Sequence, residues 1–92
     1  MSAELELIDQ LLAGSMPYPL MERHVFDSDR RRFLNSLRRL LIDGYVSMAV
    51  NDKPVETWQI SAWLRRPYDR ETERDLQQGT LWATDAGVKM LC

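Results

Sequence analysis

The stretch from Asp29 to Ile42 constrains the fold of this chain more than any other segment. At about 100° per residue it is amphipathic, with an apolar stripe broad enough to cover a core. Its apolar side holds Phe33, Leu34, Leu37, Leu40 and Leu41; its opposite side holds Arg31, Arg32, Asn35 and Arg39, with Ser36 and Arg38 on the flanks. Asp27 and Ser28 are suitable N-cap residues, and Gly44 suits the left-handed end of a helix. The spacing predicts a helix with one buried face and one arginine-rich face.

Shorter periodic segments surround this helix. Leu5, Ile8 and Leu11 recur at helical spacing and predict a first helix over 3–13. Residues 15–19 form a connection, after which Pro19 can open a second short helix that runs to about residue 26. Beyond Gly44, alternating strand formers predict a strand over 45–50, and 51–54 supply turn chemistry. The order so far is three helices followed by a strand.

The segment 55–79 allows two interpretations at its start. Trp58, Ile60, Ala62 and Leu64 lie two apart, which favours a returning strand over 55–64. Trp63 breaks that alternation, so a helix beginning at Pro54 or Ser61 is the alternative. We expect 65–79 to be an exposed loop with one helical turn, in which Tyr68 and Leu76 are the candidates for burial. A strand over 80–83 and a helix over 85–91, capped by Thr84, complete the predicted elements.

Size and composition limit the class of protein. The 92 residues contain no stretch rich in Gly, Pro or Ser that would separate two domains, so we expect a single α+β domain over 1–92. No apolar run approaches the ~20 residues that cross a bilayer, and the first residues are acidic, so we expect a cytoplasmic protein with no membrane partner. Cys92 and His24 are the only cysteine and histidine, too few for a zinc site. No phosphate loop or nucleophile elbow is present, and we predict no enzyme activity, no metal and no cofactor.

The distribution of charge is more informative than its sum. The formal net charge is −2, yet the segment 23–39 holds six arginines against Asp27 and Asp29. This segment includes the amphipathic helix, so the positive excess coincides with that helix's polar face. Arg30 is the exception, because it falls near the apolar side, and we assign it no binding role. A solvated helix face is the ordinary explanation of the other arginines. The three consecutive arginines, with no acid between Arg30 and Arg39, favour a binding role.

Two stretches carry a resemblance to a known fold family. Leu34-Asn35-Ser36-Leu37-Arg38-Arg39-Leu40-Leu41-Ile42-Asp43-Gly44-Tyr45-Val46 resembles the third helix and first wing strand of small bacterial winged helix-turn-helix regulators. Leu81-Trp82-Ala83-Thr84-Asp85-Ala86-Gly87-Val88-Lys89-Met90-Leu91 resembles the element that closes the wing in those proteins, the broad MarR, PadR and ArsR-like superfamily. There a strand ends in Leu-Thr-x-x-Gly before a helix. Ala83 departs from the Leu usual there, and 55–79 is longer than a typical wing requires. That segment is either an insertion or extended wing, or Trp58-Gln59-Ile60-Ser61 closes the wing and the remainder is an added subdomain.

The resemblance implies a transcriptional regulator that binds double-stranded DNA as a homodimer. The third helix, over about 28–43, would enter the major groove, and the wing would contact the backbone. Arginine and asparagine suit this role, because they recognise guanine and adenine edges respectively. We therefore expect Arg31, Arg32, Asn35 and Arg39 in the groove, Arg38 on a phosphate and Lys53 at the wing tip. The free amides at the start of the helix, left by an N-cap at Asp27 or Ser28, are a further candidate phosphate site.

A second interpretation keeps the fold and changes the partner. Some winged-helix domains bind only proteins, and this one would then be an interaction module, of the kind that a phage or mobile element encodes. Trp63 is out of phase with its neighbours and is the tryptophan we expect to be exposed, where it and Tyr68 would mark a protein or dimer contact. Packing within the hairpin is the plainer interpretation of all three tryptophans.

Overall fold

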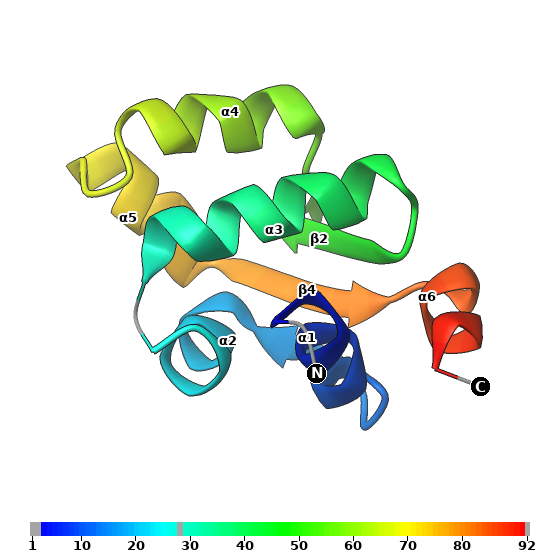
Figure 1. Ribbon diagram of the computed structural model, residues 1–92. Helices are drawn as coiled ribbons and strands as arrows, with labels where there is room; N and C mark the ends of the chain where they lie inside the picture. The colour runs from blue at the N-terminus through cyan, green and yellow to red at the C-terminus, as the bar shows by residue number, and fades with distance from the viewer. Residues whose placement is uncertain (1–2, 28, 92) are drawn as a thin grey trace.

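The computed structural model describes residues 3–27 and 29–91, which form a small α+β domain. In chain order the elements are α1 (Ala3–Leu11), β1 (Met16–Pro17), α2 (Tyr18–Val25), α3 (Arg30–Ile42), β2 (Val46–Val50), β3 (Lys53–Pro54), α4 (Thr57–Arg65), α5 (Arg70–Gln77), β4 (Gly79–Ala83) and α6 (Asp85–Met90). Figure 1 shows the helices arranged around a narrow sheet, with α3 and α4 next to each other.

The four strands form one antiparallel sheet in the order β1-β4-β2-β3. Its centre is the β2–β4 pair, aligned from Val46 opposite Ala83 to Val50 opposite Gly79. Both edge strands are two residues long and contain a proline, Pro17 in β1 and Pro54 in β3. Because proline lacks an N–H to donate, it is suited to sheet edges and discourages pairing with a further strand.

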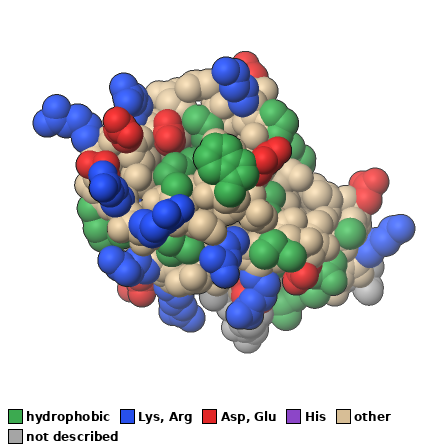
Figure 2. Space-filling view, turned by 90° about the horizontal axis from the view of Figure 1, so that it is seen from above, with side chains coloured by type: hydrophobic (Ala, Val, Ile, Leu, Met, Phe, Trp, Pro, Cys, Tyr) green, Lys and Arg blue, Asp and Glu red, His purple; other side chains and the backbone are tan. Residues whose placement is uncertain are grey.

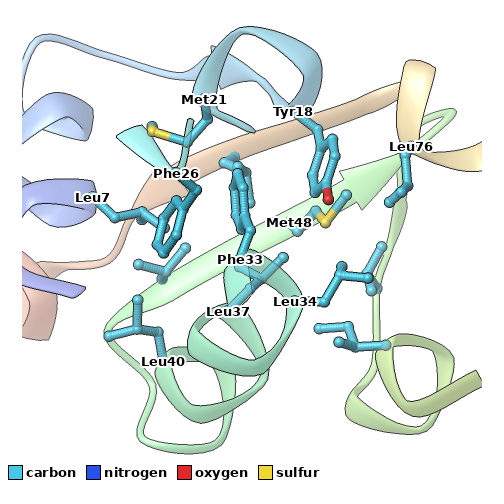
Figure 3. Packing of buried hydrophobic residues seen from close by; sticks show 14 of the residues in the cluster. Leu7, Tyr18, Met21, Phe26, Phe33, Leu34, Leu37, Leu40, Met48 and Leu76 are labelled. Carbon is cyan, nitrogen blue, oxygen red and sulfur yellow. The ribbon is translucent and has the colours of Figure 1, made fainter. Parts of the chain in front are cut away.

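One face of the sheet carries the core. Val46, Met48 and Leu81 are buried on the side that faces α1, α2 and α3, whereas Thr80 and Trp82 on the other side are exposed. The core is completed by leucines, isoleucines and aromatic residues from the helices (Figure 3). Phe33 lies between two other rings, 4.7 Å from Tyr18 and 4.6 Å from Phe26 between centroids, and both pairs are stacked. This packing fixes α3 against the sheet by its apolar face.

The structure confirms most of the predicted elements. The amphipathic helix, the first two helices, the strand after Gly44, the strand before Thr84 and the last helix all form, with bounds shifted by a few residues. The turn after β2 is also confirmed: Asn51 and Asp52 both have positive φ, at 52° and 65°. Two such residues in succession form the tight turn that matches the twist of a hairpin. The N-cap of α3 is Asp29 and not Asp27; Ser28 lies outside the described residues.

The returning strand predicted over 55–64 is wrong. Only Lys53 and Pro54 pair with β2, and the chain then forms α4, so Trp58-Gln59-Ile60-Ser61 is not a wing-closing strand. The amide of Glu56 donates to Gln59 Oε1 at 2.9 Å, which is the glutamine arm of a capping box. This cap starts a helix whose buried residues, Ile60 and Trp63, are three apart.

The exposed loop predicted over 65–79 is wrong as well, because α5 occupies most of it. Asp69 caps this helix by accepting from the amide of Arg70 at 3.0 Å, and Glu71 and Glu73 in the first turn favour the positive end of the helix dipole. Leu76 is buried as expected, whereas Tyr68 is exposed. Since β4 pairs with β2, α4 and α5 form an insertion between two neighbouring strands of the sheet.

The two stretches that carry the family resemblance meet at the end of the sheet. Thr84 donates its amide to Tyr45 O at 3.1 Å and its hydroxyl to Gly44 O, and the same hydroxyl caps α6 by accepting from Gly87 N. A Cβ on Gly87 would lie 2.1 Å from Tyr45 O, so only glycine lets α6 approach this backbone. The junction explains why a glycine follows the threonine at this spacing.

Candidate nucleic-acid interface

The polar side of α3 is open to solvent. All six residues assigned to DNA are exposed, and five of them lie on α3: Arg31, Arg32, Asn35, Arg38 and Arg39. The opposite side of the same helix is buried through Phe33, Leu34, Leu37 and Leu40. The helical spacing therefore predicts the exposed face of α3 correctly.

A second helix borders this face. Arg38 Nη1 donates to Ser61 Oγ of α4 at 3.4 Å, so the two helices adjoin at their solvent-facing edge. Trp58 and Arg65 lie one turn to either side of Ser61 on the same stripe of α4, and both are exposed. Figure 1 shows α4 running back along α3 in the opposite direction. Arg65 therefore extends from Ser61 toward the Arg31 end of α3, and Trp58 toward the Ile42 end.

We call this two-helix surface the basic face. It consists of Arg31, Arg32, Asn35, Arg38 and Arg39 of α3 and Trp58, Ser61 and Arg65 of α4. Figure 2 views the molecule from the α4 side and shows Lys and Arg side chains, with Asp and Glu side chains among them, around a protruding hydrophobic group. The structure thus adds two exposed residues, Trp58 and Arg65, that the sequence interpretation did not assign. Both residues can be assigned to this face only when α4 is known to be a helix.

Most arginines of the basic face are free of acidic partners. Arg39 Nη1 lies 3.2 Å from Glu4 Oε1 of α1, an exposed ion pair. Arg31, Arg32, Arg38 and Arg65 form no ion pair with any other described residue. Unpaired guanidinium groups bind an incoming phosphate or carboxylate without first giving up a partner.

An aromatic and an apolar side chain border the same surface. Trp58 is 65% exposed, and its indole Nε1 donates to Glu56 Oε2 at 2.7 Å. Ile42, at the end of α3, is 64% exposed. The Glu56 hydrogen bond uses the indole's only donor, so the ring itself is what Trp58 offers to a ligand.

The predicted phosphate site at the start of α3 is not supported by the geometry. Asp29 occupies the N-cap, and its Oδ1 accepts from the amide of Arg32 at 3.3 Å. The Asp29 carboxylate already accepts a hydrogen bond from a free amide at the helix start, as a phosphate would, and its negative charge repels a second anion.

Lys53 is exposed on edge strand β3, opposite Val50. It belongs to the hairpin that precedes α4 and contributes no hydrogen bond or ion pair to the basic face among the described residues. The short hairpin leaves α4, rather than a long wing, beside α3.

Arg30 is buried, in agreement with the interpretation that gave it no binding role. Its Nε donates to Glu22 Oε1 at 2.7 Å, and its Nη1 donates to Pro67 O at 2.8 Å and also to Glu73 Oε2. Its guanidinium carbon lies 5.1 Å from the centre of the Tyr68 ring. The Arg30 side chain of α3 therefore forms hydrogen bonds with α2, with α5 and with the segment between α4 and α5.

The same cluster shifts three pKa values, and, against the opposing effect of burial, the hydrogen bonds to Glu22 and Glu73 raise that of Arg30. The hydrogen bond from Arg30 lowers the pKa of Glu73, and Gln77 adds a second hydrogen bond in the same direction. Burial raises the pKa of Tyr18, as does neighbouring Glu22, whose Oε1 accepts from the phenol at 2.9 Å. The cluster consequently holds Tyr18 as a neutral donor and Glu73 as a carboxylate at neutral pH.

The expected exposure of Trp63 is wrong. It is only 5% exposed, and its indole Nε1 donates to Asp75 Oδ2 of α5 at 3.4 Å. Trp63 falls on the buried side of α4 because the segment is a helix, where it aligns with Ile60 and not with the strand alternation. Tyr68, the other predicted contact residue, is exposed but lies over Arg30.

A hollow of about 570 Å³ separates α4 from α5. Its lining mixes both signs of charge, with Arg66 and Asp69 among the residues, around the edge of Trp63. Within residues 3–27 and 29–91 no three His, Cys, Asp or Glu side chains are grouped so as to hold a metal ion. No described helix is long and apolar enough to cross a membrane.

The basic face is therefore the most distinctive surface feature of the described chain, and its function must be inferred from its own geometry. Comparison with protein-family models, with curated proteins and with solved structures finds no match to this chain.

Proposed function

We propose that this protein is a winged helix-turn-helix transcriptional regulator that binds double-stranded DNA through α3. The observation that carries the proposal is the exposed side of α3, which presents four arginines and Asn35 while the opposite side is anchored in the core. A helix held in this way projects its polar side chains as a rigid ridge. At 13 residues it is about 20 Å long, sufficient to lie along one segment of a major groove.

The order of elements supports the same proposal. Three helices precede β2, and β2 pairs antiparallel with β4 as the two strands of a wing would. In this interpretation α4 and α5 are a helical insertion within the wing. The contact of Thr84 and Gly87 with Gly44 and Tyr45 brings together the two stretches that resemble winged-helix regulators.

Each exposed polar side chain of α3 has a role in the proposed complex. Arg31 and Asn35 lie along the middle of the exposed stripe and read base edges, Arg on guanine and Asn on adenine. Arg32 and Arg39 lie at its α1 side, where Arg39 exchanges its half-buried partner Glu4 for DNA. Arg38 binds a phosphate. A good bidentate base contact contributes about 1–3 kcal/mol of discrimination against the wrong base.

We also propose that the protein acts as a homodimer on DNA. One α3 helix covers only a few base pairs, and a two-fold arrangement doubles the contacts and reads a two-fold site with half-sites about 34 Å apart. This assignment predicts a DNA complex with two protein chains per specific site, measurable by light scattering.

The test is fluorescence anisotropy of a labelled duplex titrated with protein at 50 and 200 mM salt. Binding should weaken by roughly one to three decades between the two salt concentrations, because several arginines displace counterions. Arg31→Gln combined with Arg32→Gln should reduce affinity at 50 mM salt by at least about tenfold. Arg70→Gln combined with Arg74→Gln is the matched control, since both arginines are exposed on α5, away from the basic face. Equal affinities for the two double variants would contradict a role for α3.

The exposed Trp58 and Ile42 favour one other candidate, a protein-interaction module. Aromatic side chains surrounded by arginines are typical of protein contact surfaces. Under this alternative, the wild-type protein shows no affinity for duplex DNA at 50 mM salt, and the Arg31 and Arg32 substitutions are without effect in the DNA assay.

A further inference from the structure

The insertion that distinguishes this chain places a helix directly beside α3. Packed helices lie about 8–10 Å apart between axes, and the major groove, about 12 Å wide, admits one helix. If α3 enters the groove, α4 cannot enter with it. A neighbour at that distance lies instead over the wall of the groove, which is a sugar-phosphate backbone.

The side chains on this edge of α4 have the chemistry that a phosphate backbone requires. Ser61 is a hydroxyl donor, and it accepts from Arg38 at 3.4 Å, so that the Arg38 guanidinium is held between the two helices. Arg65 follows Ser61 by one turn, about 6 Å further along α4 in the direction of Arg31. Neither Arg38 nor Arg65 has an acidic partner among the described residues. The edge thus offers two free guanidinium groups and one hydroxyl.

Within the insertion, α4 carries one charged side chain, Arg65, and Arg66 follows directly after this helix. On α5, Arg70 and Arg74 are interspersed with Glu71, Glu73 and Asp75, and that helix has no positive excess. The buried cluster of Arg30 with Glu22 and Glu73 holds α5 in place. Glu71 and Asp75 of α5 line the hollow that Trp58 and Arg65 also line. Of the two inserted helices, α4 is the one that packs on α3, and it adds the exposed Arg65 to the cationic surface.

We propose that α4 acts as a phosphate clamp, in which Arg65, together with Arg38 and Ser61, binds the DNA backbone that flanks the groove occupied by α3. The clamp replaces the contact that the hairpin tip would make in a shorter wing, so Lys53 has no comparable role. This inference rests on the proposed function, because it requires α3 in the groove. Its ligand is the phosphodiester backbone, and it adds affinity without sequence preference.

The experiment compares Arg65→Gln with Arg70→Gln and Lys53→Gln. Each removes one exposed positive charge, so the three variants share the same change in net charge. The loss of one phosphate contact lowers the slope of log K against log salt by about 0.9. For Arg65→Gln, the ratio of wild-type to variant affinity should therefore shrink about 3.5-fold between 50 and 200 mM salt. The same loss should appear on duplexes of unrelated sequence, whereas the control Arg70→Gln should keep the wild-type slope. Lys53→Gln tests the competing contact at the hairpin tip.

The outcomes separate the clamp from the proposed function. If Arg65→Gln behaves as Arg70→Gln does while Arg31→Gln with Arg32→Gln weakens binding, the clamp is wrong and the role of α3 stands. If Lys53→Gln lowers the slope and Arg65→Gln does not, the hairpin and not α4 contacts the backbone. If wild-type protein binds no duplex at 50 mM salt, the proposed function is wrong, and the clamp is wrong as well because it depends on that function. A thermal melt of each variant verifies that these exposed substitutions leave the fold intact.

Discussion

At the scale of single residues, Arg30 and its neighbour Arg31 have different roles because they lie on opposite sides of the same helix. Arg30 has an 8% exposed side chain and a partner, Glu22, that is 12% exposed, whereas Arg31 is open to solvent. A buried ion pair is costly to break, because the partner that remains is a buried and uncompensated charge. The two arginines therefore provide a matched pair of sites on one helix.

The corresponding prediction concerns stability. Arg30→Met should lower the free energy of unfolding by about 3–5 kcal/mol, since it strands Glu22 and removes the contacts with Glu73 and Pro67 O. Arg31→Met should change it by less than about 0.5 kcal/mol. Urea denaturation followed by tryptophan fluorescence measures both. Similar effects at the two positions would contradict a structural role for the Arg30 cluster.

Glu73 makes the stability of the fold depend on pH. Its pKa in the folded protein is lowered from 4.5, first by the hydrogen bond from Arg30 and then by Gln77. A lowered pKa means that the stabilising contribution is present above the unfolded-state pKa and is lost as pH falls through the folded-state value. Glu73→Gln should therefore reduce stability at pH 7, and the difference from wild type should be lost at an acidic pH below the lowered pKa of Glu73. Thermal unfolding at both pH values checks this, with exposed Glu71→Gln as the control; a difference that persists in acid would exclude the ionised pair as its cause.

At the scale of elements, the contact between α6 and the turn that joins α3 to β2 depends on the absence of a side chain at Gly87. Tyr45 O lies 2.1 Å from the position that a Cβ on Gly87 would occupy, and the obstacle is backbone, which does not turn aside as a flexible side chain does. Gly87→Ala should destabilise the protein by about 1–3 kcal/mol, the typical cost of an overpacked site. Lys89→Ala, on the exposed side of the same helix, should have little effect. Chemical denaturation of the two variants is the measurement, and a neutral Gly87→Ala would show that α6 can move away from Tyr45.

The elements also show which parts of the fold the sequence could predict. The helix 30–42 was predictable because five apolar residues gather on one face, and every arginine except Arg30 lies on the opposite face. The helix α4 was not, because Trp58, Ile60, Ala62 and Leu64 alternate as a strand does, while Ile60 and Trp63 fit a helix equally well; only the cap between Glu56 and Gln59 decides. The helix α5 buries only Thr72 and Leu76, too few for a periodic signal.

The candidate site follows the same division. Its α3 half could be predicted from periodicity, because the exposed residues lie on one local element. Its α4 half could not, because the position of Arg65 depends on the packing of α4 on α3, which joins residues more than 20 apart in sequence through contacts such as Arg38 with Ser61. For this reason Trp58 is exposed and Trp63 is buried, the reverse of what the strand interpretation predicts.

At the scale of the whole molecule, the net charge and the charge of the basic face have opposite signs. The chain carries −2 overall, yet the basic face holds five arginines. A phosphate near this surface responds chiefly to charges within a Debye length, about 10 Å at 0.1 M salt. Acidic residues at the rim of the face therefore affect binding more than distant ones, and Glu4 is the one that contacts an arginine of the face.

This arrangement leads to a prediction for α1. Glu4→Gln removes the carboxylate that lies 3.2 Å from Arg39 Nη1 and should tighten DNA binding several-fold at 50 mM salt. Glu6→Gln is the matched control, because it removes the same charge from the same turn of α1 at an exposed position with no ion pair among the described residues. Both variants lose the same interaction with the helix dipole, so their difference isolates the Arg39 contact. The gain from Glu4→Gln should shrink at 200 mM salt, where screening weakens the residual repulsion. Equal gains in the two variants would mean that only the net charge matters and that Arg39 does not contact the DNA.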